Sequence, residues 1–407
     1  TTGSQNTFIG RYAGAANTTG ADCVVVGSGA FSTNTTGTSN TAIGKGALNA
    51  NTTGDYNTAI GRDALLSNTT ASNNTAIGTS SLDANTTGDH NVGIGAGTLG
   101  ALVGGYHNNV AIGRDALTAS TVNSGNVAIG AYSMDGTNST SSTQCTAVGY
   151  GTMSAALAGY GNTAIGDSSM NAATSAFENT AVGRSALVAL TTGDYNTTVG
   201  SYAGDAVTTG THNVVVGYLA GTSAIDITTG TQNVCLGNHT HTSTTGATAQ
   251  IVLGYNAVGS ADSSLTFGLH GTDSAIAFGA TSITAPSDVR LKEDIEDEKI
   301  GLDFITDLRP VTFRWKKEKD IPSEMNTHKA DSDERVMNGK YNHGFIAQEV
   351  KEVIDRHDLK DGFDMWTEDE VDGRQRIGEA SLMPLMVKAI QELSAKVEEL
   401  EDKLNKE

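Results

Sequence analysis

A pentapeptide that recurs every 17 residues constrains the fold of this chain more than any other feature. Asn-Thr-Ala-Ile-Gly stands at residues 40–44, 57–61, 74–78 and 162–166, and degenerate copies fill the intervals. The final glycines lie 17 residues apart almost throughout, with single steps of 18, 19, 20 and a last step of 14. They are Gly10, Gly27, Gly44, Gly61, Gly78, Gly95, Gly113, Gly130, Gly149, Gly166, Gly183, Gly200, Gly217, Gly237, Gly254 and Gly268. This regularity is typical of a repeat architecture.

Each repeat predicts one short strand, a second apolar position and a turn. Thr and Ile or Val alternate with Asn and Ala across the pentapeptide, which is the two-residue period of a pleated strand. Four residues after the glycine, nine repeats carry a Leu or Met, as at Leu48, and an Asn-Thr-Thr-Gly turn follows, as at 51–54. A single repeat cannot bury its apolar face, whereas stacked coils pair their strands with the coils above and below.

The sequence therefore predicts a mainly β shaft over residues 1–286, a parallel β-roll or β-helix solenoid of about sixteen repeats. The absence of proline before residue 286 agrees, because a central strand does not tolerate it. One such chain is thin, with few aromatic residues, and its many small residues would let neighbouring backbones approach closely. We infer a homotrimer, although the period alone does not set the number of chains.

Composition changes abruptly at residue 286. All four prolines and both tryptophans lie at or beyond it. Residues 1–286 hold 5 Lys or Arg and 14 Asp or Glu, whereas residues 287–407 hold 20 and 31. Two domains of different kinds are therefore expected, with their boundary between 286 and 287.

The totals exclude several classes of protein. No apolar run approaches the ~20 residues of a membrane-spanning helix, so we expect no membrane insertion. The net charge of -20 and the lack of a basic patch argue against nucleic acid as a partner. Three scattered cysteines make neither a disulfide framework nor a zinc knuckle. The chain starts at Thr1 inside a repeat, so we interpret it as a piece of a longer protein.

Residues 287–407 have the pattern of a charged α+β domain. A turn into a strand is expected at 308–315, and a helix is expected to begin within 343–350. Residues 382–404 predict a long helix whose apolar side chains are spaced 4, 3, 4, 3, 4, which is the seam of a trimeric coiled coil. The seam residues are Met386, Ile390, Leu393, Val397, Leu400 and Leu404.

Both parts resemble known proteins. The repeats resemble the heads of trimeric autotransporter adhesins and the shafts of phage tail fibres. Residues 287–407 resemble the C-terminal intramolecular chaperone of endosialidase-type phage tailspikes and tail fibres. Four motifs carry this resemblance in the family's order: Ser-Asp-x-Arg-Leu-Lys at 287–292, Leu-Arg-Pro-Val at 308–311, Gly-Phe-Ile-Ala-Gln-Glu-Val at 344–350 and Pro-Leu-x-Val-Lys-Ala-Ile-Gln-Glu-Leu at 384–393.

The resemblance implies a domain that trimerises, templates the folding of the fibre before it and then cuts itself away. The serine and lysine that act in the family map onto Ser287 and Lys292. A serine hydroxyl needs a base to accept its proton, and a lysine amine is such a base only in its neutral form, which burial or nearby positive charge favours. Attack by Ser287 on the carbonyl of Pro286 closes a five-membered ring, so we place the scissile bond between them. The alternative interpretation is that Ser287 caps a helix and Lys292 is a solvated side chain.

His239 and His241 form a His-x-His pair, which in a strand would present both imidazoles on one face. Three chains could then offer six imidazoles to a transition metal such as iron, which similar pairs bind in some phage fibres. A solvated loop is the alternative. No other cofactor is expected.

The resulting hypothesis is a self-cleaving subunit of a phage tail fibre. It would be made in the host cytoplasm, joined to upstream tail proteins in the virion, and bind a polysaccharide or protein receptor on the host surface. The alternatives are a bacterial trimeric surface adhesin that keeps its tail, and a polysaccharide-degrading tailspike. The shaft has few aromatic residues to stack sugars and no catalytic signature, so binding is favoured over hydrolysis.

Overall fold

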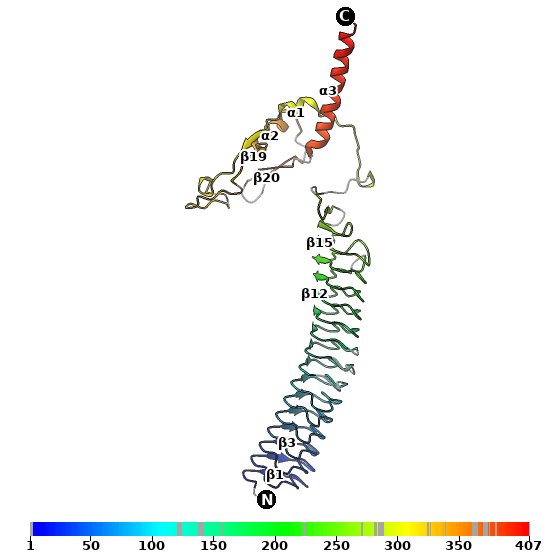
Figure 1. Cartoon of the computed structure of the whole chain (residues 1–407), viewed down its shortest axis with the longest axis vertical. Coiled ribbons are helices and arrows are strands. Elements are labelled where there is room, and N and C mark those ends of the chain that lie inside the picture. Colours follow the sequence, from blue (N-terminus) through cyan, green and yellow to red (C-terminus); the bar gives the residue numbers. More distant parts are fainter. Residues whose placement is uncertain are drawn as a thin grey trace. The chain divides into compact units, whose positions relative to one another are not determined.

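The computed structural model divides into two compact units, Thr1–Ser287 and Asp288–Glu407 (Figure 1). The structure describes residues 3–119, 124–136, 142–155, 158–222, 225–269, 272–280, 283, 289–323, 325, 327–337, 339–359, 365–368, 373, 375–378 and 381–406. Over these ranges, no helix combines the length and the apolar character that crossing a bilayer requires.

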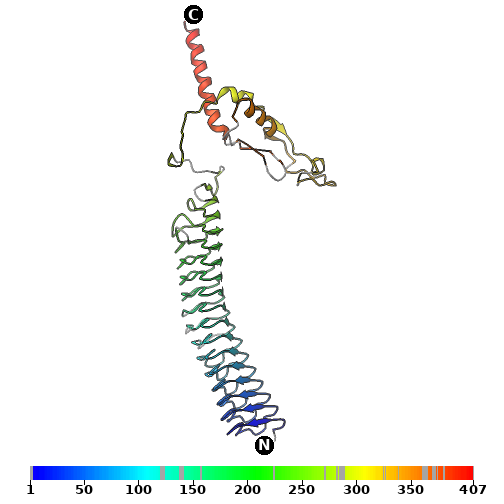
Figure 2. The same cartoon turned by 180° about the vertical axis from the view of Figure 1, so that it is seen from behind.

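The first unit is a parallel β-solenoid of about fifteen turns over residues 7–269, which confirms the predicted fold class. Each turn contributes one strand at its repeat glycine, and consecutive strands pair in parallel with equivalent residues opposite one another, as Thr41 lies opposite Thr58. Figures 1 and 2 show these strands as a stack of rungs. The strands are β1 (Thr7–Ile9), β2 (Val24–Val26), β3 (Thr41–Ile43), β4 (Thr58–Ile60), β5 (Thr75–Ile77), β6 (Val92–Ile94), β7 (Val110–Ile112), β8 (Val127–Ile129), β9 (Thr146–Val148), β10 (Thr163–Ile165), β11 (Thr180–Val182), β12 (Thr197–Val199), β13 (Val214–Val216), β14 (Val234–Leu236), β15 (Gln250–Tyr255) and β16 (Ser264–Leu269).

The last strand of this unit runs the other way. β17 (Ser274–Ala277) pairs with β16 in antiparallel orientation, with Ile276 opposite Leu265. The parallel ladder therefore ends in a hairpin, a feature that the repeat pattern does not predict.

Two apolar positions per turn fill the solenoid interior. The middle residue of the strand, such as Ala42 or Ala59, points inward and is fully buried. The Leu or Met four residues after the glycine is also fully buried, which confirms the predicted second apolar position. These residues are Leu48, Leu65, Leu82, Leu99, Leu117, Met134, Met153, Met170 and Leu187.

The backbone reaches that second position through left-handed conformations. Leu48 and Leu65 have φ of 50° and 49°, which is uncommon for residues other than glycine. The repeat glycine has a different requirement: at Gly44 φ is 132°, and a Cβ there would lie 2.3 Å from the carbonyl oxygen of Gly61 on the next turn. Only glycine lets successive turns stack this closely.

A row of buried asparagines connects the turns from inside. In most turns the asparagine that precedes the strand is fully buried, and it bonds to its equivalents on neighbouring turns. The Asn57 backbone N–H donates to Asn40 Oδ1 (2.9 Å), and the Asn74 backbone N–H donates to Asn57 Oδ1 (3.1 Å). Asn57 Nδ2 also donates to the carbonyl oxygen of Ala71 (2.8 Å). The row consists of Asn40, Asn57, Asn74, Asn91, Asn109, Asn126, Asn162, Asn179, Asn196, Asn213 and Asn233.

A second asparagine row runs through the first five turns. Asn51 Nδ2 donates to Asn34 Oδ1 (3.0 Å), and Asn68 Nδ2 donates to Asn51 Oδ1 (2.8 Å). Because a buried amide without a partner is costly, these rows fix the vertical alignment of the turns as well as stabilising them.

The second unit is a small α+β domain. β18 (Val311–Phe313) pairs with β19 (Asn342–Gly344), and β20 (Trp366–Glu368) pairs with β21 (Gln375–Ile377), both antiparallel. Its helices are α1 (Leu302–Asp307), α2 (Ala347–Arg356) and α3 (Leu382–Leu404), with short 3-10 turns η1 (Val289–Leu291) and η2 (Glu318–Asp320). One core joins them, and it comprises Phe304, Val350, Val353, Ile354, Met365, Leu382 and Leu385.

The asparagine row gives a direct test of what aligns the turns. Asn57→Ala removes the acceptor of the Asn74 N–H and the donor to the Ala71 carbonyl. Each of these buried groups then lacks a partner, which lowers the free energy of unfolding by about 1–3 kcal/mol per group. We expect a clear fall in the thermal unfolding midpoint of the shaft, followed by circular dichroism. Thr53→Ala, at an exposed turn position, is the control and should leave the midpoint unchanged. Equal midpoints for the two variants would contradict a structural role for the row.

Candidate functional site

The predicted cleavage site lies at the junction of the two units. Pro286 and Ser287 lie outside the described residues, so the structure places only the lysine of the predicted dyad. Lys292 follows η1, its backbone N–H donates to the Val289 carbonyl oxygen (3.2 Å), and its side chain is exposed in a single chain. The Ser287–Lys292 dyad therefore stays a prediction.

The second unit brings three of the four sequence motifs together. The Leu-Arg-Pro-Val motif leads into β18, and the Gly-Phe-Ile-Ala-Gln-Glu-Val motif leads from β19 into α2. Pairing of Val311 with Gly344 therefore sets the two motifs side by side. The closing motif lies on α3, which packs against α1.

Opposite charges join the first two of these motifs. Arg309 Nε donates to Glu349 Oε2 (2.9 Å), while Arg309 Nη2 pairs with the other carboxylate oxygen. The hydrogen bond from Arg309 lowers the pKa of Glu349, so the carboxylate stays charged. The pair is exposed, and exposed ion pairs contribute little to stability because solvent screens them. Its two-point geometry therefore orients α2 against the strand pair more than it stabilises the unit.

The closing motif supplies the N-terminal cap of α1. Gly301 has no side chain with which to cap the helix, and Glu392 of α3 accepts a hydrogen bond from the Leu302 backbone N–H (2.8 Å). A Cβ at residue 301 would lie 2.7 Å from that carboxylate. The absence of a side chain at this position leaves room for the Glu392 carboxylate, whose negative charge is favourable at the positive end of the helix dipole.

A second ionic contact joins the C-terminal ends of α1 and α2. Arg356 Nη1 donates to Asp307 Oδ2 (2.8 Å), and His357 Nε2 lies 3.0 Å from the same oxygen. The hydrogen bond from His357 and the charge of Arg356 lower the pKa of Asp307. The His357 ring also contacts the edge of buried Phe304, with 5.4 Å between ring centroids.

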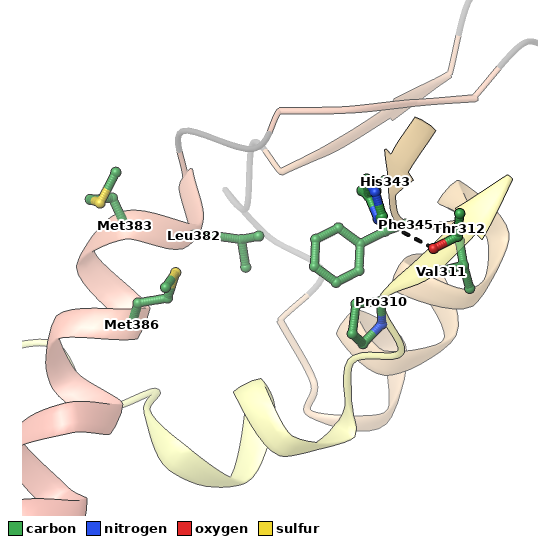
Figure 3. A pocket seen from close by; sticks show the side chains of 9 residues that line it. Pro310, Val311, Thr312, His343, Phe345, Leu382, Met383 and Met386 are labelled. Atoms are coloured by element: carbon green, nitrogen blue, oxygen red, sulfur yellow. Dashed lines mark hydrogen bonds between the residues drawn. The ribbon is translucent and has the colours of Figure 1, made fainter. Parts of the chain in front are cut away.

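The three motifs also line an apolar pocket of about 420 Å³ (Figure 3). Phe345 and Pro310 lie on one side of it, and Leu382 and Met386 of α3 lie on the other (Figure 3). Its polar side chains are Thr312 and His343, whose Oγ1 and Nδ1 lie 3.2 Å apart. With neither a carboxylate nor a lysine in its lining, the pocket suits apolar packing better than catalysis.

The two histidines of the predicted metal pair have different surroundings. His239 lies in a turn with φ of 57° and not in a strand, so the strand alternation that would place both imidazoles on one face does not apply to this pair. Its ring contacts Tyr218 and Tyr255, whereas His241 is almost fully buried and its Nδ1 lies 3.2 Å from the Thr242 carbonyl oxygen. No cluster of three or more metal-ligating side chains occurs in the described part of one chain. A metal shared between chains stays a prediction.

The cysteines are unsuited to nucleophilic chemistry. All three are buried and unpaired with one another. Burial raises the pKa of Cys23 and Cys145, and it raises the pKa of Cys235 to about 12. The thiols therefore stay protonated at neutral pH. Cys23 and Cys145 take the place of asparagine in the buried row, and Asn126 Oδ1 accepts from the Cys145 backbone N–H (2.9 Å).

Comparison with known proteins identifies part of the second unit. Residues 287–359 match the model of a peptidase family described as the chaperone of endosialidase. No curated protein and no solved structure gives a significant match to the chain. The match includes α1, β18, β19 and α2 and ends before α3, although the Glu392 contact and the shared core tie α3 to it. The chain thus carries an endosialidase chaperone domain at residues 287–359, and a β-solenoid precedes this domain in the sequence.

Proposed function

We propose that this chain is a subunit of a homotrimeric bacteriophage tail fibre. Its solenoid contacts a receptor on the host surface, and its C-terminal unit directs assembly and then cuts itself away. The observation that carries this proposal is the order of the two parts, a β-solenoid followed directly by an endosialidase chaperone domain. That combination fits a tail fibre or tailspike, and the family implies a self-cleaving, peptidase-like chaperone.

Helix α3 supports the trimer. One face of the helix packs Leu382, Leu385 and Ala389 into or against the core of its own unit. The predicted seam lies on the remaining surface, where its six residues are 45–74% exposed in a single chain. A helix with so regular an apolar row is stabilised by burying that row against equivalent helices.

The outer face of the strand ladder is a second, independent argument for the trimer. The residue just before each repeat glycine points outward, and the isoleucines at this position form a column along the shaft. Ile43, Ile77, Ile94, Ile129 and Ile165 are 36–40% exposed. A continuous aliphatic column of this length is unusual on the surface of a single chain. Three chains with their columns turned inward would cover it.

The cleavage chemistry uses groups of this chain alone. Lys292 Nζ accepts the proton of the Ser287 hydroxyl, and Ser287 Oγ attacks the carbonyl carbon of Pro286. The C–N bond between the two residues breaks as the amine takes the proton, leaving an ester that water hydrolyses. In one chain the Lys292 side chain is exposed to solvent. Burial within an assembled trimer would make the amine a base, so cleavage would follow correct assembly.

Intact mass spectrometry tests the cleavage. The expressed parent chain should yield two fragments divided between residues 286 and 287, whereas Ser287→Ala and Lys292→Ala should stay at full length. Lys299→Ala, an exposed lysine paired with Glu296, is the control and should still be cut. A parent that remains whole while forming a folded trimer would refute autoproteolysis, and the surface adhesin that keeps its tail would then be the better interpretation.

Light scattering after size exclusion tests the trimer. In the uncleaved Ser287→Ala background, the chain should have the mass of three copies. Replacing Ile390 and Leu393 by Ser should lower the trimer fraction strongly, because both lie in the exposed seam. Glu398→Ser, another exposed position of α3, should leave the mass unchanged. Retained helicity by circular dichroism would separate lost association from unfolding, and an unchanged trimer in the double variant would contradict the seam.

A further inference from the structure

Most tyrosines of the shaft lie at equivalent places in the repeat, just after the repeat glycine. Ten of the eleven tyrosines lie before residue 286, and six of the ten stand one or two residues after a repeat glycine. These six are Tyr12, Tyr132, Tyr150, Tyr202, Tyr218 and Tyr255. Because the turns stack in register, equivalent positions lie above one another. Scattered sequence positions thereby become one edge of the solenoid, where the chain leaves the strand.

Three aromatic rings form a continuous row near the end of the shaft. Tyr218, His239 and Tyr255 come from three consecutive turns. The centroids of Tyr218 and His239 lie 5.5 Å apart, and those of His239 and Tyr255 lie 6.3 Å apart. The backbone beneath is fixed, since the His239 N–H donates to the Tyr218 carbonyl oxygen (3.0 Å). We call these three residues the aromatic row.

The two tyrosines of the aromatic row are exposed, and the rings contact one another edge to face. Neighbouring rings meet at 78° and 69°, so the edge of one ring approaches the next instead of face covering face. Tyr218 and Tyr255 are 48% and 56% exposed. On the preceding turn, Tyr202 carries the guanidinium of Arg184 over its ring at 4.5 Å.

Polar groups accompany the row. Asn238 is exposed, and its Oδ1 accepts a hydrogen bond from the Tyr218 backbone N–H (3.2 Å). Asn256 stands on the next turn, with its N–H donating to the Asn238 carbonyl oxygen (2.8 Å). Aromatic faces beside amide side chains suit a sugar, whose C–H face packs on a ring while its hydroxyl groups bond to amides. Tyr218 and Tyr255 are two turns apart, or about 10 Å, the scale of two linked sugar rings.

We infer that Tyr218, His239 and Tyr255 bind an oligosaccharide that lies along the shaft. The inference rests on the proposed host-binding function and adds the chemical class of the receptor, a bacterial surface polysaccharide. A protein partner fits less well, because the aliphatic surface of the shaft is the separate isoleucine column. The edge-to-face rings and amides are the surface that matches sugar hydroxyl groups and C–H faces.

The test measures adherence to a panel of bacterial strains. The protein is expressed from the full chain and labelled with a fluorophore. Cells of each adhering strain are tested before and after periodate oxidation, which destroys sugar diols. The surface polysaccharide purified from the adhering strain is then titrated into the protein. Replacing Tyr218 and Tyr255 by Ala should weaken polysaccharide binding by roughly tenfold or more, since two aromatic contacts are lost. The combined variant Tyr218→Phe and Tyr255→Phe should bind the polysaccharide as the parent does. Tyr56 is an exposed tyrosine at another edge, and Tyr56→Ala should have no effect on binding.

Loss of adherence on periodate treatment, together with selective weakening in the double alanine variant, would establish the site. Adherence that survives periodate, or a double variant that binds as the parent does, would overturn it while leaving host binding intact. Loss of the trimer in the double variant would also overturn it, because the tyrosines would then be chain-to-chain contacts. Failure to adhere to any strain would count against both this inference and the proposed host-binding function.

Discussion

The buried asparagine side chains of the shaft find their partners on the turns above and below. Asn57 accepts from Asn74 and donates to Asn40 and to the Ala71 carbonyl, so a turn that slipped by one residue would leave several polar groups buried and unsatisfied. The repeat glycine enforces the same alignment by another route, since a side chain there would collide with the next turn. The positions of the isoleucine column and the aromatic row both follow from this alignment.

The chaperone unit is held together in a different way. Among its described residues, seven buried apolar side chains form the core, and its sequence motifs contact one another through exposed charges. Arg309 with Glu349, and Glu392 with the N-terminus of α1, set the relative positions of helices that a small core alone would orient poorly. Its longest helix, α3, leaves the apolar seam exposed in a single chain, so much of the apolar surface of that helix lies outside this core.

Much of the shaft could be predicted from the period of the sequence, because strand position, glycine spacing and buried leucines all repeat with it. The left-handed backbone of Leu48 could not be predicted, since leucine has no preference for that region and only the surrounding turn imposes it. The left-handed backbone of His239 could not be predicted either, since a His-x-His pair is compatible with both a strand and a turn. In the chaperone unit the motifs were recognisable, but their contacts were not. Arg309 and Glu349 are 40 residues apart, and only the pairing of β18 with β19 brings them together.

The antiparallel strand β17 determines what kind of end the shaft has. A parallel solenoid that stopped after a complete turn would offer an open strand edge in the correct register to receive the first turn of another molecule, and fibres could then grow end to end. β17 occupies the edge of β16 with a short strand of opposite direction, so the next parallel turn has no template. The hairpin therefore limits the number of parallel turns from within the chain, and it protects this end of the solenoid from end-to-end growth.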